Sequence, residues 1–219
     1  MNVRYAFRRL LRPRGREAFL ATLPTNARVL DVGCGSNSPA DVKAQRPDLY
    51  YVGVDVSDYN HSVAPQTVAD EYHVATPEGF ADSIAALGKF DAVIWSHNLE
   101  HCNAPERMFD VVGGALGPGG ALYLAWPAEH TVNLPSRGGC LNFFDDPTHR
   151  EMPRFARVLE RLREAGLKTT FESRAYKPLL PYALGGLLEP ISRLTGRVAP
   201  LRSTWAFYGF ESVVWFKRT

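Results

Sequence analysis

The chain has 219 residues, of which 45% are hydrophobic and 22% are charged, and its formal net charge is +2. This length and composition predict one folded domain and exclude a mostly disordered chain. No apolar run approaches the roughly 20 residues of a membrane-spanning helix, and the first residues lack the apolar segment of a secretory leader. The three cysteines are scattered, which disfavours a disulfide framework and favours a reducing cytoplasm.

Charge is unevenly distributed along the chain. Residues 1–16 hold six arginines and no acid, residues 17–150 hold 7 basic and 17 acidic side chains, and residues 151–219 hold 12 basic and 6 acidic side chains. The acidic middle predicts a cationic or neutral small ligand, whereas the basic ends predict contact with anionic surfaces. A mixed, solvated surface is the plainer alternative.

The N-terminal segment is predicted to be a helical extension. Residues 2–11 place apolar side chains at helical spacing among arginines, which predicts a short basic amphipathic helix that ends before Pro13. A second short helix is expected over residues 15–23. We interpret residues 1–24 as a basic extension and residues 25–219 as the main domain.

Apolar runs and helical patterns then alternate. The apolar runs predict buried strands at residues 28–32, 50–55, 67–69, 91–96 and 121–125. Helical patterns lie between them at residues 39–45, 78–87 and 104–115. This alternation predicts an α/β fold with a doubly wound, mostly parallel sheet and helices on both of its faces.

The last part of the chain contains a predicted insertion. Pro153 is placed to open a helix that Gly166 ends, and residues 167–172 and 212–217 read as two further strands. The segment between these strands, about residues 173–211, is too long for a simple turn and is rich in aromatic and apolar residues. We interpret it as an inserted lid or a partner-facing hairpin.

A glycine-rich turn follows the first strand and is the main motif. Gly33 and Gly35 let the backbone turn sharply and approach a ligand. Asp55 ends the second strand, where a carboxylate can accept hydrogen bonds from two ribose hydroxyls. These features fit any nucleoside-containing cofactor. Ser38 stands where a dinucleotide fingerprint requires glycine, and Asp31 inside the first strand suits a cationic ligand better than a diphosphate.

Four stretches occur in an order that resembles class I S-adenosylmethionine-dependent methyltransferases, over roughly residues 25–170. The stretches are VLDVGCGSN (29–37), YVGVDVSD (51–58), FDAVIWSHNLEH (90–101) and LGPGGALYLAWP (116–127). The resemblance implies a seven-stranded sheet whose last strand is antiparallel. It also implies S-adenosylmethionine as the cofactor.

The resemblance also implies roles for individual residues. Those expected to contact the cofactor are Asp31, Gly33, Cys34, Gly35, Asp55, Val56, Asp70, Ser96 and His97. Within this set Asp55 is expected to bind the ribose, and Asp70 is expected to meet the exocyclic amine of adenine after the third strand.

Histidines after the strands are the candidate bases. Methyl transfer to a hydroxyl requires alignment of the nucleophile and a group that accepts its proton, and the pKa of histidine suits this role. His149 and His101 are the preferred candidates. The resemblance to ubiquinone-pathway and small-RNA O-methyltransferases also raises a divalent-metal site formed by His97, Glu100, His101 and His149. We favour the reading without a metal.

The resulting prediction is transfer of a methyl group, most simply to oxygen, on a small-molecule or glycan-type acceptor. The alternatives are a non-catalytic S-adenosylmethionine-binding regulatory or scaffold protein, and a nicotinamide-dependent dehydrogenase, which Ser38 disfavours. Basic residues at the ends lack a nucleic-acid-binding module. The arginine-rich helix predicts weak peripheral contact with the inner face of a membrane. The oligomeric state is left open.

Overall fold

A computed structural model describes residues 3–35, 37–59 and 61–219, and side chains from residue 5 onward. Seven strands form a single sheet in the order β3-β2-β1-β4-β5-β7-β6. The strands are β1 (Arg28–Val32), β2 (Tyr50–Asp55), β3 (Glu71–Val74), β4 (Phe90–Ser96), β5 (Leu116–Pro127), β6 (Leu167–Ser173) and β7 (Glu211–Arg218). Strands β1 to β5 pair in parallel, and β7 runs antiparallel to both β5 and β6. The predicted fold class is confirmed.

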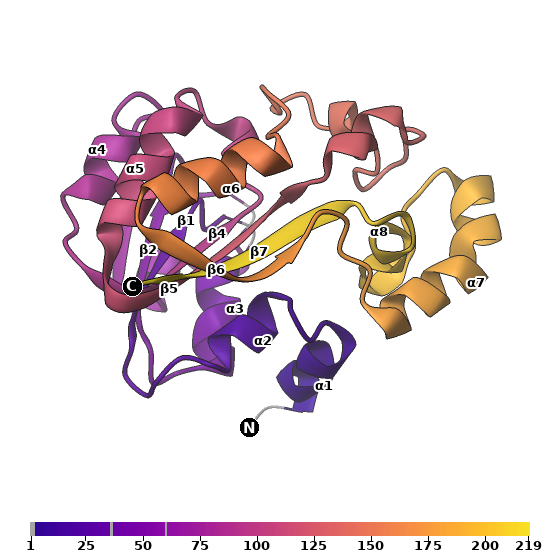
Figure 1. Cartoon of the computed structure of the whole chain (residues 1–219). Helices are drawn as coiled ribbons and strands as arrows, with labels where there is room; N and C mark the ends of the chain where they lie inside the picture. Colours follow the sequence, from indigo (N-terminus) through magenta and orange to yellow (C-terminus); the bar gives the residue numbers. More distant parts are fainter. Residues whose placement is uncertain (1–2, 36, 60) are drawn as a thin grey trace.

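Helices cover both faces of this sheet (Figure 1). The α-helices are α1 (Val3–Leu11), α2 (Arg16–Leu20), α3 (Ser38–Gln45), α4 (Phe80–Ala85), α5 (Pro105–Ala115), α6 (Phe155–Glu164), α7 (Leu179–Thr195) and α8 (Ser203–Tyr208). Short 3₁₀ turns are η1 (Pro65–Thr67), η2 (Leu99–His101), η3 (Glu129–Asn133), η4 (Phe143–Asp145) and η5 (Pro200–Arg202).

Two buried clusters follow the alternation of side chains along each strand. One cluster joins Leu30, Val52 and Val93 to the inner faces of α4, α5 and α6. The other joins Val29 and Ile94, their neighbours along the strands, to α2 and α3. Every central strand is therefore apolar on both faces, as expected for a sheet between two helical layers.

The third strand lies later than the sequence predicted. Residues 67–69 do not form a strand, because Pro65 starts the 3₁₀ turn η1 and the Thr67 hydroxyl donates to the Ala64 carbonyl at 2.7 Å. The strand is instead β3, which pairs with β2 from Val52–Glu71 to Asp55–Val74. This shift moves Asp70 from the end of a strand to a position just before one.

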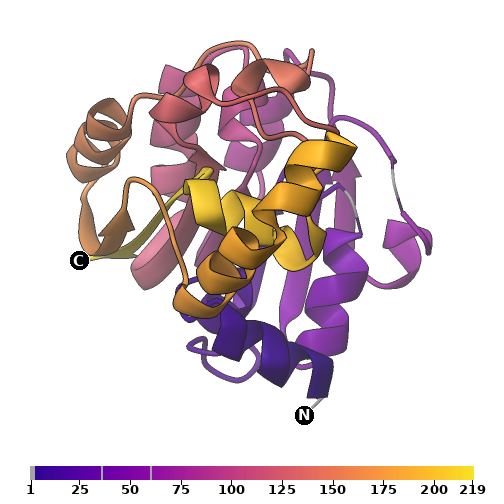
Figure 2. The ribbon, with the colours of Figure 1, turned by 90° about the vertical axis from the view of Figure 1, so that its right-hand side faces the viewer.

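The predicted insertion between β6 and β7 is helical. Helices α7 and α8 pack against each other, and we call residues 179–208 the helical cap. Their close approach depends on Gly185, where an added Cβ would lie 2.1 Å from the Ser203 carbonyl oxygen. Figure 2 shows α7 crossing the face of the molecule, with its first turns near α1.

The N-terminal helices are held against the main domain. The Trp215 indole donates to the Arg14 carbonyl at 3.0 Å, and the Arg14 amide donates to the Tyr176 hydroxyl at 3.0 Å. Residues 3–24 are therefore part of the same packed unit, while residues 1 and 2 of the predicted extension lie outside the described part. None of the described helices combines the length and hydropathy needed to cross a membrane.

Candidate active site

A cavity of about 1090 Å³ opens at the sheet edge where the parallel strands end. Its inner wall is formed by residues that follow or end β1, β2 and β4, and its outer wall by α1, the start of α2 and residues 201–210 of the chain. Ligands bind at this edge in doubly wound sheets, because the loops there leave a crevice between adjacent strands.

The glycine turn shapes the inner wall. Gly33 has φ of +70°, a conformation that side chains disfavour, and its amide donates to the Val54 carbonyl at 2.8 Å. An added Cβ would lie 2.4 Å from the Asn98 side chain at Gly33 and 2.4 Å from the Tyr59 ring at Gly35. The turn therefore accepts these two neighbours only because it has no side chains of its own.

Asp55 is a buried carboxylate at the end of β2. Its Oδ2 accepts from the Gly35 amide at 2.8 Å, and its Oδ1 accepts from the Val56 amide at 2.7 Å. Burial raises the pKa of Asp55, and these two backbone hydrogen bonds partly oppose the rise. Each carboxylate oxygen can accept a second hydrogen bond, so Asp55 can still bind a pair of hydroxyls in the cavity.

Asp31 is buried in β1 and also lines the cavity. Its Oδ2 accepts from the Ser38 hydroxyl at 2.5 Å and from the Tyr51 hydroxyl at 2.7 Å. Burial raises the pKa of Asp31, which the nearby Arg16 and the two hydroxyls partly oppose. The Ser38 hydroxyl also accepts a hydrogen bond from Arg16 at 2.8 Å. Ser38, which stands where a dinucleotide fingerprint requires glycine, therefore links α2 to β1.

Two predicted cofactor residues lie outside this cavity. Cys34 is completely buried, and its side chain packs beneath the turn against Gly53. Asp70 precedes β3, where it accepts from the Tyr51 amide at 2.7 Å and pairs with Lys43 at 2.8 Å. Because Asp70 is at the amino end of its strand, it lies at the opposite edge from the cavity. Its predicted contact with adenine is wrong.

His97 is enclosed by two acids at the end of β4. Its Nδ1 lies 3.2 Å from Glu100 Oε1 and its Nε2 lies 2.9 Å from Glu211 Oε1. Burial alone would lower the pKa of His97, but the hydrogen bonds to both carboxylates outweigh this and raise it to about 9. At neutral pH both ring nitrogens are therefore hydrogen-bond donors to the two carboxylates.

Glu211 connects His97 to the outer wall. This buried carboxylate also pairs with Arg12 and, at 3.2 Å, with Arg202. Burial alone would raise the pKa of Glu211, but the nearby cations hold it well below its usual range. The three cations around this carboxylate directly follow α1, directly follow β4 and belong to the helical cap, so Glu211 joins three distant parts of the chain.

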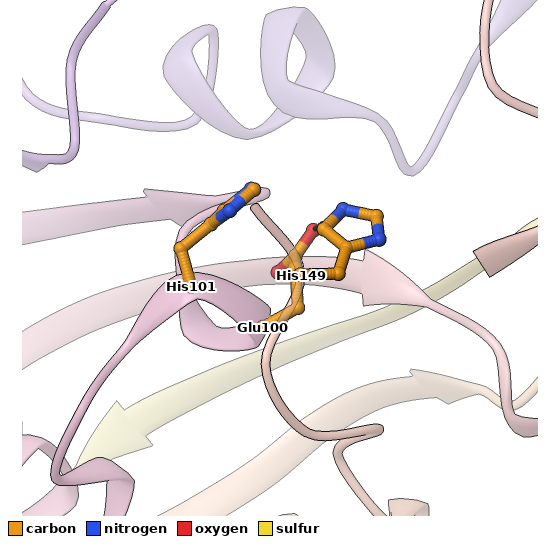
Figure 3. Close-up of side chains that lie close together, drawn as sticks. All are labelled: Glu100, His101 and His149. Atoms are coloured by element: carbon orange, nitrogen blue, oxygen red, sulfur yellow. Dashed lines mark ion pairs between the residues drawn. The ribbon is translucent and has the colours of Figure 1, made fainter. Parts of the chain in front are cut away.

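Glu100, His101 and His149 form a second polar cluster (Figure 3). One potential ligand atom from each residue lies within 4.8 Å of the others. His149 Nδ1 donates to the Phe143 carbonyl at 2.6 Å, which leaves Nε2 unprotonated in the neutral ring, 3.9 Å from Glu100 Oε1. Glu100 is buried, and its Oε2 has no partner among the described residues.

This cluster arises because two loops meet. His101 belongs to η2, directly after β4, and His149 lies in the loop before α6. The Arg150 amide donates to the Glu100 carbonyl at 2.9 Å, which ties the two loops together. One carboxylate and two imidazoles can act as an acid–base group, and they also form a donor set that suits divalent transition metals.

The structure thus brings most predicted site residues into one cavity. Those lining it are Asp31, Gly33, Gly35, Asp55, Val56, Ser96, His97, His101 and His149. Sequence patterns did not indicate that Tyr59, Arg12 and Glu211 belong to this region. Tyr59 follows Asp55 by four residues, and this spacing only weakly indicates a site residue. No local pattern marks the pairing of Arg12 with Glu211.

Comparison with known families identifies the domain. A family model described as a methyltransferase domain matches residues 3–171. The chain belongs to this methyltransferase family. The family model confirms the methyltransferase domain that the resemblance implied.

Individual relatives agree with the family. The methyltransferase is 32% identical over 161 residues to a ubiquinone biosynthesis O-methyltransferase of Xanthomonas axonopodis pv. citri (strain 306), covering 66% of this chain. The match spans 64% of the length of that relative.

Solved structures share the fold. An S-adenosylmethionine-dependent methyltransferase from Mesorhizobium loti has a TM-score of 0.61 at 18% identity, covering 92% of this chain and 96% of that one. A second such methyltransferase, from Archaeoglobus fulgidus, has a TM-score of 0.55 at 16% identity, covering 99% of this chain and 100% of that one.

Proposed function

We propose that this methyltransferase transfers a methyl group to an oxygen atom of a small-molecule or glycan-type acceptor, with His149 or His101 as the base. The observation that carries the proposal is the position of the histidine pair in the same cavity as the glycine turn and Asp55. The similarity to an O-methyltransferase of ubiquinone biosynthesis supports oxygen as the accepting atom.

The inner wall supports binding of the cofactor there. The turn at Gly33 and Gly35 brings Asn98 and Tyr59 close to the backbone beside Asp55, and Asp55 can accept hydrogen bonds from both ribose hydroxyls. Asp31 contributes negative charge to the same wall, which favours a sulfonium cation. When bound, S-adenosylmethionine supplies an electrophilic methyl group on its sulfonium sulfur.

The chain's own contribution to the reaction is alignment, exclusion of water and proton removal. His149 is the better candidate base because its Nδ1 is held by a carbonyl while its Nε2 keeps a free lone pair. His149 Nε2 would accept the proton of the acceptor hydroxyl when the methyl group is transferred from the cofactor. Placement of the reactants accounts for most of the acceleration, and a base adds about 10²- to 10⁴-fold.

Substitution of the histidines tests this assignment. Purified protein is incubated with methyl-labelled cofactor and a panel of phenols and glycans, and label transfer is measured for wild type, His149→Ala and His101→Ala. We expect His149→Ala to lower turnover about 100-fold or more, with unchanged affinity for S-adenosylhomocysteine in calorimetry. Full turnover in both variants would refute a histidine base. Cofactor binding with no transfer to any acceptor would favour the non-catalytic alternative.

A metal-assisted version of the same reaction is the second candidate. The buried, unpartnered Glu100 Oε2 next to two imidazoles is the observation that favours it. Glu100, His101 and His149 would hold the ion, without His97. Elemental analysis of tag-free protein tests this version, with Glu100→Gln as the matched variant. Bound metal in wild type and none in Glu100→Gln would support it, whereas metal-free protein that ignores added Mg²⁺, Mn²⁺ or Zn²⁺ would refute it.

A further inference from the structure

Helix α7 exposes a row of large apolar side chains. Leu180, Leu187, Ile191 and Leu194 recur at intervals of seven, four and three residues, which places them on one side of the helix. Their exposed fractions range from 52% to 88%, and Leu179 at the start of the helix is 77% exposed. A continuous exposed apolar row of this size marks an interaction surface, because isolated surface leucines do not line up along a helix.

Helix α1 adds to this surface. The first turns of α7 lie near α1 (Figure 2). Helix α1 exposes Phe7 and Leu10, which are 50% and 69% exposed. These two helices come from residues 3–11 and 179–195, so the apolar surface is a product of the fold.

The segment that contains the row is rich in basic residues. Residues 174–210 contain five basic residues and a single acid, Glu189. Glu189 is already paired with Arg137 at 2.7 Å and accepts from the Tyr208 hydroxyl at 2.6 Å. Arg193 on α7 and Arg9 on α1 are both exposed, so each of the two helices carries an accessible guanidinium group as well as exposed apolar side chains.

This combination indicates one kind of partner. Helices that expose both leucines and arginines match the interface of a bilayer with anionic headgroups, where the apolar side chains enter the acyl boundary and the guanidinium groups meet phosphates. A second copy of the chain is less suitable, because it would bring two positive surfaces together. We propose that α7 and α1 form the surface through which the protein docks reversibly on an anionic lipid bilayer.

The location of the surface has a consequence for the cavity. Leu201 and Arg202 follow α7 and line the cavity, and Arg8 and Leu11 of α1 line it from the other side. A bilayer that contacts α7 and α1 would lie next to the outer wall.

Vesicle flotation tests the surface directly and without cofactor, so its result is independent of the proposed methyl transfer. Wild-type protein is mixed with vesicles of phosphatidylcholine alone, or with equal parts of phosphatidylcholine and phosphatidylglycerol. We expect binding to the anionic vesicles. The double variant Leu187→Ser/Leu194→Ser should lower the partition coefficient about tenfold or more. Its control is Val63→Ser/Val74→Ser, which removes two exposed apolar residues in and before β3.

A charge-reversal pair tests the electrostatic part. Arg9→Glu/Arg193→Glu should also lower binding to anionic vesicles about tenfold or more. The matched control, Lys168→Glu/Lys217→Glu, reverses two exposed lysines at the end of the β6–β7 pair away from α7, and should bind as wild type does. All variants change exposed residues, and their thermal unfolding should confirm that they fold.

Wild-type protein that does not float with anionic vesicles would overturn the proposal. If that protein is also a dimer in light scattering, and Leu187→Ser/Leu194→Ser dissociates the dimer, the surface would be assigned to a second copy of the chain.

Discussion

The two walls of the cavity are built in different ways. The inner wall uses the glycine turn and the residues that end or follow β1, β2 and β4, which the register of neighbouring parallel strands brings to one edge. The outer wall uses long charged side chains, in which Glu211 binds Arg12, Arg202 and His97. The inner wall therefore depends on local geometry, whereas the outer wall depends on ion pairs between distant segments.

Removal of Glu211 should produce the largest effect, and it acts on the outer wall. Glu211→Ala leaves three cations near one another without their shared counter-charge, so we expect the free energy of unfolding to fall by about 3–5 kcal/mol. Chemical denaturation provides the measurement. Glu172→Ala, which removes an exposed carboxylate from β6, should cost less than about 0.5 kcal/mol. Equal costs for the two variants would show that the ion pairs do not hold the outer wall.

The next effect concerns the inner wall and should appear in binding. Asp55→Ala removes the proposed acceptor of two ribose hydroxyls, so we expect the affinity for S-adenosylhomocysteine to fall about 100-fold in calorimetry. Asp70→Ala is the matched control, because it also removes a carboxylate that accepts a backbone amide, but at the opposite sheet edge. Equal losses of affinity in both variants would contradict the assignment of the ribose site.

The smallest expected effect is a dependence of stability on pH. The pKa of His97 is about 9 in the folded protein, above the ordinary 6.5 of an unfolded chain. Its stabilising contribution is therefore complete below pH 6.5 and is lost as the pH rises through 9. We expect the free energy of unfolding, measured with a chelator present, to decline over this range more steeply in wild type than in His97→Gln. Parallel curves would show that His97 is not protonated between its two acids.

The same contrast explains what could be predicted from the sequence. Gly33, Gly35 and Asp55 could be placed together because the carboxyl ends of adjacent parallel strands share one edge. The assignment of Asp70 failed because the third strand was expected too early, and a shift of four residues moved the acid from one edge to the other. His101 and His149 were placed correctly at the cavity edge, since both follow elements that end there.

The outer wall could not be predicted in the same way. Arg12 and Glu211 are separated by 199 residues, and no local pattern links them. The helical spacing of leucines in α7 was present, but Pro181, Gly185 and Pro190 obscured it. Pro181 is tolerated because it lies in the first turn, where amides lack partners within the helix, and Gly185 is required by the contact with α8.

The pairing of Arg12 with Glu211 also sets an order for biosynthesis. Helix α1 leaves the ribosome before β7, and the carboxylate that anchors Arg12 is added 199 residues after it. Until β7 has emerged, Arg12 and His97 have no common counter-charge, and the outer wall of the cavity lacks these ion pairs. A nascent chain therefore completes the outer wall only after β7 has been translated and has emerged, which makes its assembly a late event in the life of the polypeptide.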